Sequence, residues 1–186
     1  MLIEKLKSSL NGEHSPISTN AKESAVIIPL LKTESGWLVI FEKKPSYDRL
    51  HPSQISFPGG SREEKDKTFI DTAVRETEEE LGIKRQNIEI IGAVEPTKTL
   101  TTNFIIYPFV GLIRQNPPYS INTQEVEKII FIPLDYLIDN SPIPIGIYTF
   151  RGRQRKTPML NYKGEIIWGA TARILNKFIP IVKSIL

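Results

Sequence analysis

Short hydrophobic runs separated by polar turns dominate this chain, a pattern typical of β-strands. Two early runs, 25–30 and 37–41, predict a pair of strands, and residues 33–36 between them are typical of a hairpin turn. Residues 54–57 predict a short extended piece that ends at a Pro-Gly-Gly turn. Further strands are predicted at 88–94, 105–113, 126–132, 147–150 and 159–162.

The segment 69–81 has a helical period instead, because its apolar residues recur three or four positions apart. Its predicted core face consists of Ile70, Ala73, Val74, Thr77 and Leu81. Thr68 and Asp71 have the spacing of a capping box, which favours a helix start at this point. Gly82 suits the left-handed position that follows the last turn of a helix.

Two more helices are predicted near the ends of the chain. Residues 2–10 favour a short helix within an N-terminal extension, 1–23, and 170–185 favour an amphipathic helix kinked at Pro180. A helical turn is expected over 133–138. No long linker rich in proline or glycine divides the chain, so we expect one domain over 1–186. The fold class is α/β (α+β), with helices packed on a mixed central sheet.

Composition excludes several kinds of site. The chain has 186 residues, no cysteine and two histidines, which excludes disulfides, thiolate metal sites, cysteine nucleophiles and multi-histidine metal sites. The net charge of +3 gives only a weak attraction to anions such as nucleotides. The chain has no apolar stretch of membrane-spanning length, and its N-terminus lacks the apolar core of a signal peptide. We therefore expect a cytoplasmic protein without a membrane partner.

Carboxylates crowd one turn of the predicted helix at 69–81, although the chain is basic as a whole. Residues three or four apart are neighbours on a helix, so Glu76, Glu79 and Glu80 share one face while Glu78 points elsewhere. Like charges at this spacing repel, and the C-terminal end of a helix disfavours negative charge. A bound cation would turn both effects into attraction, although a plain solvated polar face remains the alternative.

Magnesium or manganese matches such a site, because these hard cations prefer carboxylate oxygens. Magnesium takes few protein ligands and leaves its other positions to water and substrate phosphates. Gly59 and Gly60 lack side chains, so their backbone can approach a metal or a phosphate closely. The pattern therefore indicates phosphoryl chemistry on a nucleotide-like anion.

These residues together resemble the signature of the Nudix hydrolases, Gly-x5-Glu-x7-Arg-Glu-U-x-Glu-Glu-x-Gly-U, where U is bulky and apolar. Residues 75–83 read Arg-Glu-Thr-Glu-Glu-Glu-Leu-Gly-Ile, and only Thr77 departs from the second half of the signature. The first half departs more: the sixth residue after Gly60 is Asp66 rather than Glu, and eight residues rather than seven separate it from Arg75. The Nudix box then covers about 60–83.

The longer spacing resembles the coenzyme A pyrophosphatase branch of the family. That branch carries an upstream pattern similar to Arg-x-His-x-Gly-Gln-Val-x-Phe-Pro-Gly-Gly. Residues 49–60 read Arg-Leu-His-Pro-Ser-Gln-Ile-Ser-Phe-Pro-Gly-Gly, so Ser53 stands in place of a glycine. The stretch 43–46, Lys-Lys-Pro-Ser, is a weaker match to the Arg-Ser that precedes this pattern.

The resemblance implies a Nudix-type α/β/α sandwich and a metal-dependent hydrolase of a nucleoside diphosphate linked to another moiety. Coenzyme A would give 3′,5′-ADP and 4′-phosphopantetheine. The implied metal ligands for Mg²⁺ or Mn²⁺ are Glu76, Glu79, Glu80 and the carbonyl of Gly60. The implied catalytic residues are Glu79, Glu80 and Arg75, with Glu79 as a ligand or base and Arg75 orienting a glutamate. The candidate substrate contacts are Arg49, His51, Gly59, Arg151 and Arg153.

Other interpretations stay open at this point. The substrate could be ADP-ribose, a dinucleoside polyphosphate or an oxidised nucleotide. The basic run 151–156 could serve an RNA-acting member, but the favoured interpretation is a solvated loop, and nucleic acid is not the expected partner. A non-catalytic nucleotide sensor is a further alternative, against which the intact glutamate set argues. The resemblance also makes a homodimer plausible.

Overall fold

The computed structural model of the protein describes residues 2–10, 12–14, 17, 20–48, 52–99, 102–114, 118–150 and 152–186. In chain order the elements are α1 (Leu2–Ser9), β1 (Lys22–Thr33), β2 (Gly36–Lys43), β3 (Ile55–Ser56), β4 (Gly59–Ser61), α2 (Phe69–Leu81), the 3₁₀ turn η1 (Arg85–Asn87), β5 (Ile88–Ala93), β6 (Thr97–Lys98), β7 (Phe104–Ile113), β8 (Lys128–Pro133), α3 (Leu134–Asp139), β9 (Ile145–Phe150), β10 (Arg153–Tyr162), β11 (Glu165–Trp168) and α4 (Gly169–Ile185).

The larger sheet is mixed, as expected. Its main path runs β3-β2-β1-β7-β5, and in addition β4 pairs with β1, β6 with β7 and β8 with β2. The central pair β1 and β7 is parallel, whereas β1–β2, β2–β8 and β5–β7 are antiparallel. The β1–β2 pair is the predicted hairpin, and both strands are longer than the hydrophobic runs suggested, because ladder pairing extends through the flanking polar residues.

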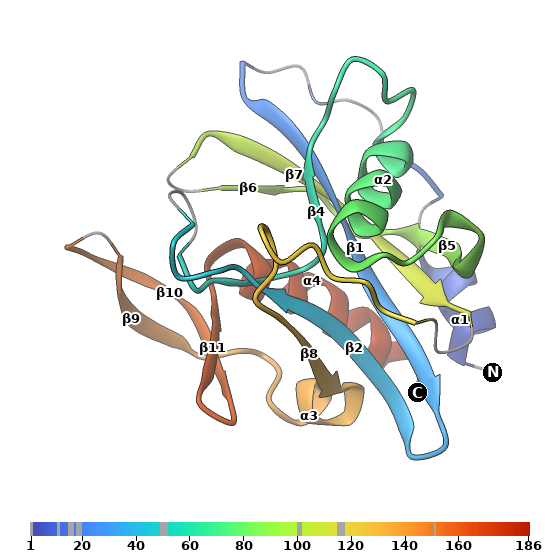
Figure 1. Ribbon diagram of the computed structural model, residues 1–186. Helices are drawn as coiled ribbons and strands as arrows, with labels where there is room; N and C mark the ends of the chain where they lie inside the picture. The colour runs from blue at the N-terminus through green and yellow to red at the C-terminus, as the bar shows by residue number, and fades with distance from the viewer. Residues whose placement is uncertain are drawn as a thin grey trace.

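Helices cover both faces of this sheet (Figure 1). On one face Ala25 and Ile27 of β1 share a buried cluster with Ala73 of α2. On the other face Val26 and Ile28 pack in a cluster with α1 and α4. Successive strand residues point to opposite faces, so a strand buried on both sides reads as a continuous apolar run. The predicted α/β/α sandwich is confirmed.

The central helix α2 begins and ends where the sequence predicted. Thr68 and Asp71 form the capping box, in which the Thr68 hydroxyl accepts from the Asp71 N–H and the Asp71 carboxylate accepts from the Thr68 N–H. Gly82 has φ 71°, the left-handed conformation expected after the last turn. Of the predicted core face, Ile70 is only half-buried.

The prediction was incomplete near the C-terminus. Strand β10 begins at Arg153, so residues 153–156 of the basic run belong to a strand paired with β9 rather than to a loop. Strand β11 had no sequence prediction at all. Cross-strand hydrogen bonds hold the polar start of β10 extended, and β11 has only four residues, so neither segment gives a long hydrophobic run. Figure 1 shows the β9–β10 ribbon extending away from α2.

Within the described segments, no helix combines the length and apolar character needed to cross a membrane.

Candidate active site

Gly59 and Gly60 bring the backbone of β4 against the acidic end of α2. Gly59 has φ +145°, and a Cβ there would lie 2.3 Å from the carbonyl oxygen of Ala25, so only glycine fits without distortion. Its N–H donates to Glu80 Oε2 at 2.9 Å. A Cβ on Gly60 would lie 2.5–2.6 Å from the carboxylate of Glu76. Both predicted glycines therefore contact predicted metal ligands.

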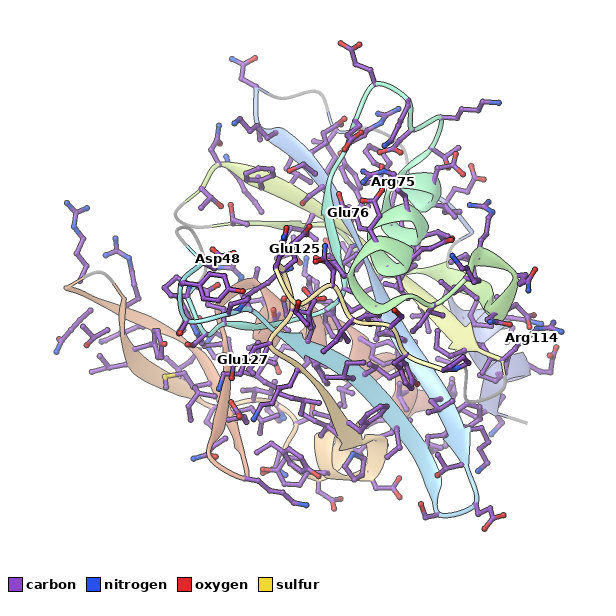
Figure 2. The ribbon with its side chains drawn as sticks, viewed as in Figure 1. Asp48, Arg75, Glu76, Arg114, Glu125 and Glu127 are labelled. Atoms are coloured by element: carbon purple, nitrogen blue, oxygen red, sulfur yellow. The ribbon has the colours of Figure 1, made fainter. Side chains whose placement is uncertain are left out.

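The three glutamates on the acidic face of α2 differ in their exposure to solvent. Glu80 is 1% exposed, Glu76 is half-buried and Glu79 is exposed. Burial is the main cause that raises the pKa of Glu76 above its usual range. Figure 2 shows Glu76 on the side of α2 that faces β4. Glu78 points away from this side and binds Lys84 at 2.8 Å, as the helical period predicted.

Arg75 joins the glutamates to each other. Its Nη1 donates to Glu76 Oε1 at 2.9 Å and to Glu79 Oε2 at 3.0 Å. Its Nη2 also donates to the carbonyl of Ser61, the last residue of β4. These charge-assisted hydrogen bonds orient both carboxylates, which is the contact expected of Arg75 from the sequence.

Asp66, whose position departs from the family signature, holds the opposite edge of Arg75. The two groups form paired hydrogen bonds of 3.0 Å each. Asp66 also accepts from the Glu63 N–H and from the Thr72 hydroxyl. The hydrogen bond from Arg75 is the main cause that lowers the pKa of Asp66 from 3.8 to about 2. Asp66 therefore positions the arginine.

A second ion-paired group reaches α2 from strand β2, and the sequence interpretation missed it. The Nζ of Lys44 lies 2.7 Å from Glu42 Oε1 and 2.5 Å from Glu80 Oε1. Glu42 is fully buried, and burial followed by the charge of Glu80 raises its pKa well above the usual range. Burial disfavours the charge of Lys44, but the two carboxylates outweigh it and raise the pKa of Lys44.

The strand period could have located this pair. Ile40 packs in a cluster with Leu81 of α2, so every second residue of β2 faces that helix. Glu42 continues this series, and Lys44 follows it just beyond the end of the strand. Two charged residues on the buried side of an apolar strand are unusual, because buried charges need partners.

The donor set fits a hard divalent cation, although the carboxylates are paired within the protein. Within the described ranges, no three acidic or histidine side chains converge closely enough to form a metal site as they stand. The pairing explains this, because Arg75 holds Glu76 and Glu79 while Lys44 holds Glu80. Three observations support the fit: the carboxylate chemistry, the close approach of the Gly60 backbone to the Glu76 carboxylate, and a buried Glu42 Oε2 without a hydrogen-bond partner in the described structure.

The candidate substrate contacts fall in different places. Arg49, His51 and Arg151 lie outside the described residues, and their roles stay predictions. Gly59 lies at the site, beside Glu80. Arg153 is exposed near the tip of the β9–β10 ribbon, which Figure 1 shows extending away from α2.

A protein-family model described as the NUDIX domain matches residues 21–149. Among curated proteins, the chain is 31% identical over 161 residues to the uncharacterized Nudix hydrolase NudL of Photorhabdus laumondii, covering 87% of this chain and 85% of the relative. It is 33% identical over 159 residues to the protein of the same name from an Enterobacter species, covering 85% and 81%.

Solved structures share the fold at low sequence identity. A MutT/nudix family protein from Enterococcus faecalis gives a TM-score of 0.57 at 12% identity, over 92% of this chain and 66% of that chain. The NUDIX domain of Shewanella oneidensis NrtR, complexed with ADP ribose, gives 0.52 at 15% identity, over 68% and 82%. At these identities the likeness concerns the fold alone.

Proposed function

This chain belongs to the Nudix hydrolase family, and from that premise we propose its substrate, its metal and the residues that act. Family membership makes it a pyrophosphohydrolase that acts on a nucleoside diphosphate linked to another moiety. Within that class, we propose coenzyme A or its derivatives as substrate and Mg²⁺ or Mn²⁺ as cofactor. The observation that carries the proposal is the meeting of Glu76 and Glu80 with the Gly59–Gly60 turn.

The choice of coenzyme A is supported by the sequence before that turn. The Arg-x-His-x-x-Gln-x-x-Phe-Pro-Gly-Gly pattern ends in Gly59 and Gly60, which lie against Glu80 and Glu76. The interval between the turn and α2 is longer than in the general Nudix signature, and this longer spacing also resembles the coenzyme A pyrophosphatase branch. In the structure, Asp66 within this interval binds Arg75 and so connects the interval to the acidic face.

Each residue has a defined part in the proposed reaction. Glu76 and Glu80 would hold the metal, with Glu79 as a further ligand or as the base that takes a proton from water. The carbonyl of Gly60 would complete the ligand set, and Arg75 keeps the carboxylates oriented. When bound, the cation supplies neutralisation of the diphosphate charge and a water of lowered pKa.

The proposed reaction adds one water across the diphosphate of coenzyme A. The water oxygen bonds to one phosphorus while the bond from that phosphorus to the bridging oxygen breaks. The bridging oxygen leaves with the other phosphate, and the released proton is taken up by a base such as Glu79. The products are 3′,5′-ADP and 4′-phosphopantetheine.

The deciding experiment is product identification by mass spectrometry. The purified protein is incubated with Mg²⁺ or Mn²⁺ and, separately, coenzyme A, ADP-ribose, a dinucleoside tetraphosphate and an oxidised nucleoside triphosphate. We expect 3′,5′-ADP and 4′-phosphopantetheine as the preferred products, and complete loss of turnover with EDTA. Preferred cleavage of another substrate refutes the coenzyme A assignment, and cleavage of none refutes the site.

Four further expectations from the sequence belong to this proposal. A single domain over 1–186 predicts one cooperative unfolding transition. A homodimer is tested by light scattering of the purified protein, and a cytoplasmic location by cell fractionation. RNA is not the expected partner, so salt-sensitive RNA binding would argue against this proposal.

A further inference from the structure

Lys44 occupies the place of a cation beside a predicted metal ligand. Its Nζ contacts Oε1 of Glu80, while the other oxygen of that carboxylate accepts the N–H of Gly59. The charge of Glu80 is therefore already neutralised from within the protein. The Lys44 side chain is 16% exposed, so solvent screens this pair only partly.

Glu42 fixes Lys44 in that place and adds a second negative charge. Its Oε1 binds the ammonium and also accepts from the Ser56 hydroxyl on β3 at 3.2 Å. Its Oε2 is buried and has no hydrogen-bond partner within the described ranges. A buried acceptor without a hydrogen-bond partner lowers the stability of the fold, so its presence points to an interaction with a positive group.

The charges of this cluster do not balance. Two carboxylates, Glu42 and Glu80, face one ammonium, that of Lys44. One ammonium can neutralise only one of these carboxylates. Such a cluster favours an incoming cation, while the ammonium at its centre opposes it.

We propose that Lys44 is an internal counter-cation that competes with a divalent metal ion for Glu80, and that Glu42 is a positioning residue that anchors Lys44 and strengthens the attraction for the metal. The affinity of the site for metal is then set by this pair at the end of β2 as well as by the helix glutamates. The inference rests on the proposed function in one respect, namely that Glu80 is a metal ligand.

The test measures Mn²⁺ affinity rather than turnover, by calorimetry and by the electron paramagnetic resonance of free Mn²⁺. Glu80→Gln identifies the binding that belongs to this site, because that variant should lose it. Lys44→Met removes the competitor, so we expect Mn²⁺ to bind about tenfold tighter or more, and Glu42→Gln should weaken binding by a similar factor. Opposite shifts in the two variants are the specific result, since general loosening of the site would weaken both.

Lys43→Met is the matched control. It removes the same charge one residue earlier, from a lysine that binds Glu127 and Glu165 instead of Glu80. We expect its Mn²⁺ affinity to stay within about twofold of the wild type, because its charge lies on the other side of the strand. An equal gain in both lysine variants would overturn the proposal, because net charge alone would then explain it.

A double variant covers the case in which Lys44→Met does not fold because Glu42 is left unpaired. Glu42→Gln with Lys44→Met removes both charges together, which proteins tolerate better than losing one partner. It should bind Mn²⁺ more tightly than Glu42→Gln alone, and equal or weaker binding refutes the competition. If the wild type itself shows no Glu80-dependent Mn²⁺ binding, the proposed function fails together with this inference. Normal wild-type binding without the opposite shifts refutes the inference alone.

Discussion

Asp66 and Arg75 form a two-point ion pair, in which Arg75 Nε donates to Oδ1 and Nη2 donates to Oδ2 of Asp66, each at 3.0 Å. The pair joins the loop before α2 to the face of the helix that carries the glutamates. The remaining nitrogen, Nη1 of Arg75, donates to both Glu76 and Glu79. Asp66 therefore affects the position of the candidate metal ligands through Arg75. The aspartate reaches the arginine despite the extra residue between the turn and the helix.

Replacing Asp66 with Ala should lower the free energy of unfolding by about 3 kcal/mol, because it leaves a largely buried guanidinium short of its main partner. Urea denaturation at neutral pH measures the change. Glu64→Ala removes an exposed carboxylate from the same loop and should change stability by less than about 0.5 kcal/mol. Equal effects of the two variants would show that the ion pair contributes nothing specific.

The lowered pKa of Asp66 predicts that acid reduces the stability of the protein. The folded pKa of Asp66 is lowered from 3.8 to about 2, so its contribution is present above about pH 4 and is lost as the pH falls through about 2. The contribution is about 2 kcal/mol, since one pKa unit corresponds to about 1.4 kcal/mol. The stability difference between wild type and Asp66→Asn, measured by urea denaturation, should shrink over this interval. A difference that stays constant from pH 5 to pH 2 would contradict the assignment.

Glu80→Gln should reduce turnover by about 100-fold or more, because a metal-ion contribution of several kcal/mol depends on its ligands. Circular dichroism and thermal unfolding should still show a folded protein. Glu78→Gln makes the same chemical change on a neighbouring residue that binds Lys84, and it should keep most of the activity. Unchanged turnover in Glu80→Gln would remove this residue from the proposed ligand set.

Gly60→Ala tests the close approach of β4 to α2. The added Cβ would meet the Glu76 carboxylate at 2.5–2.6 Å, so the glutamate must move, and we expect turnover to fall by about tenfold or more. Gly12→Ala is the control, since a Cβ there has no heavy atom within 4 Å. Steady-state kinetics of both variants decide the matter. A Gly60→Ala protein with wild-type kinetics would show that the position of Glu76 does not matter for the reaction.

The elements that the sequence predicted well are those whose signals are local. The capping box at Thr68, the helical period and the glycine at 82 all act within a few residues, and α2 has the predicted bounds. Strand β11 and the start of β10 were not predicted, because neither forms a long hydrophobic run and their extended form comes from pairing with β10 and β9 in hairpins. The strand period could have located Lys44, but it could not show the contact of Lys44 with Glu80, which spans 36 positions.

The order of residues was enough to identify the family, the acidic helix and the glycine turn, because spacing along a helix and the conformational freedom of glycine are properties of short segments. The folded structure was needed to show that Asp66 binds Arg75 and that Lys44 joins Glu42 to Glu80. These contacts join a loop and a strand to a helix across the fold. The strength of such ion pairs depends on the distance between the charges and on their burial, and neither quantity can be read from the amino-acid sequence.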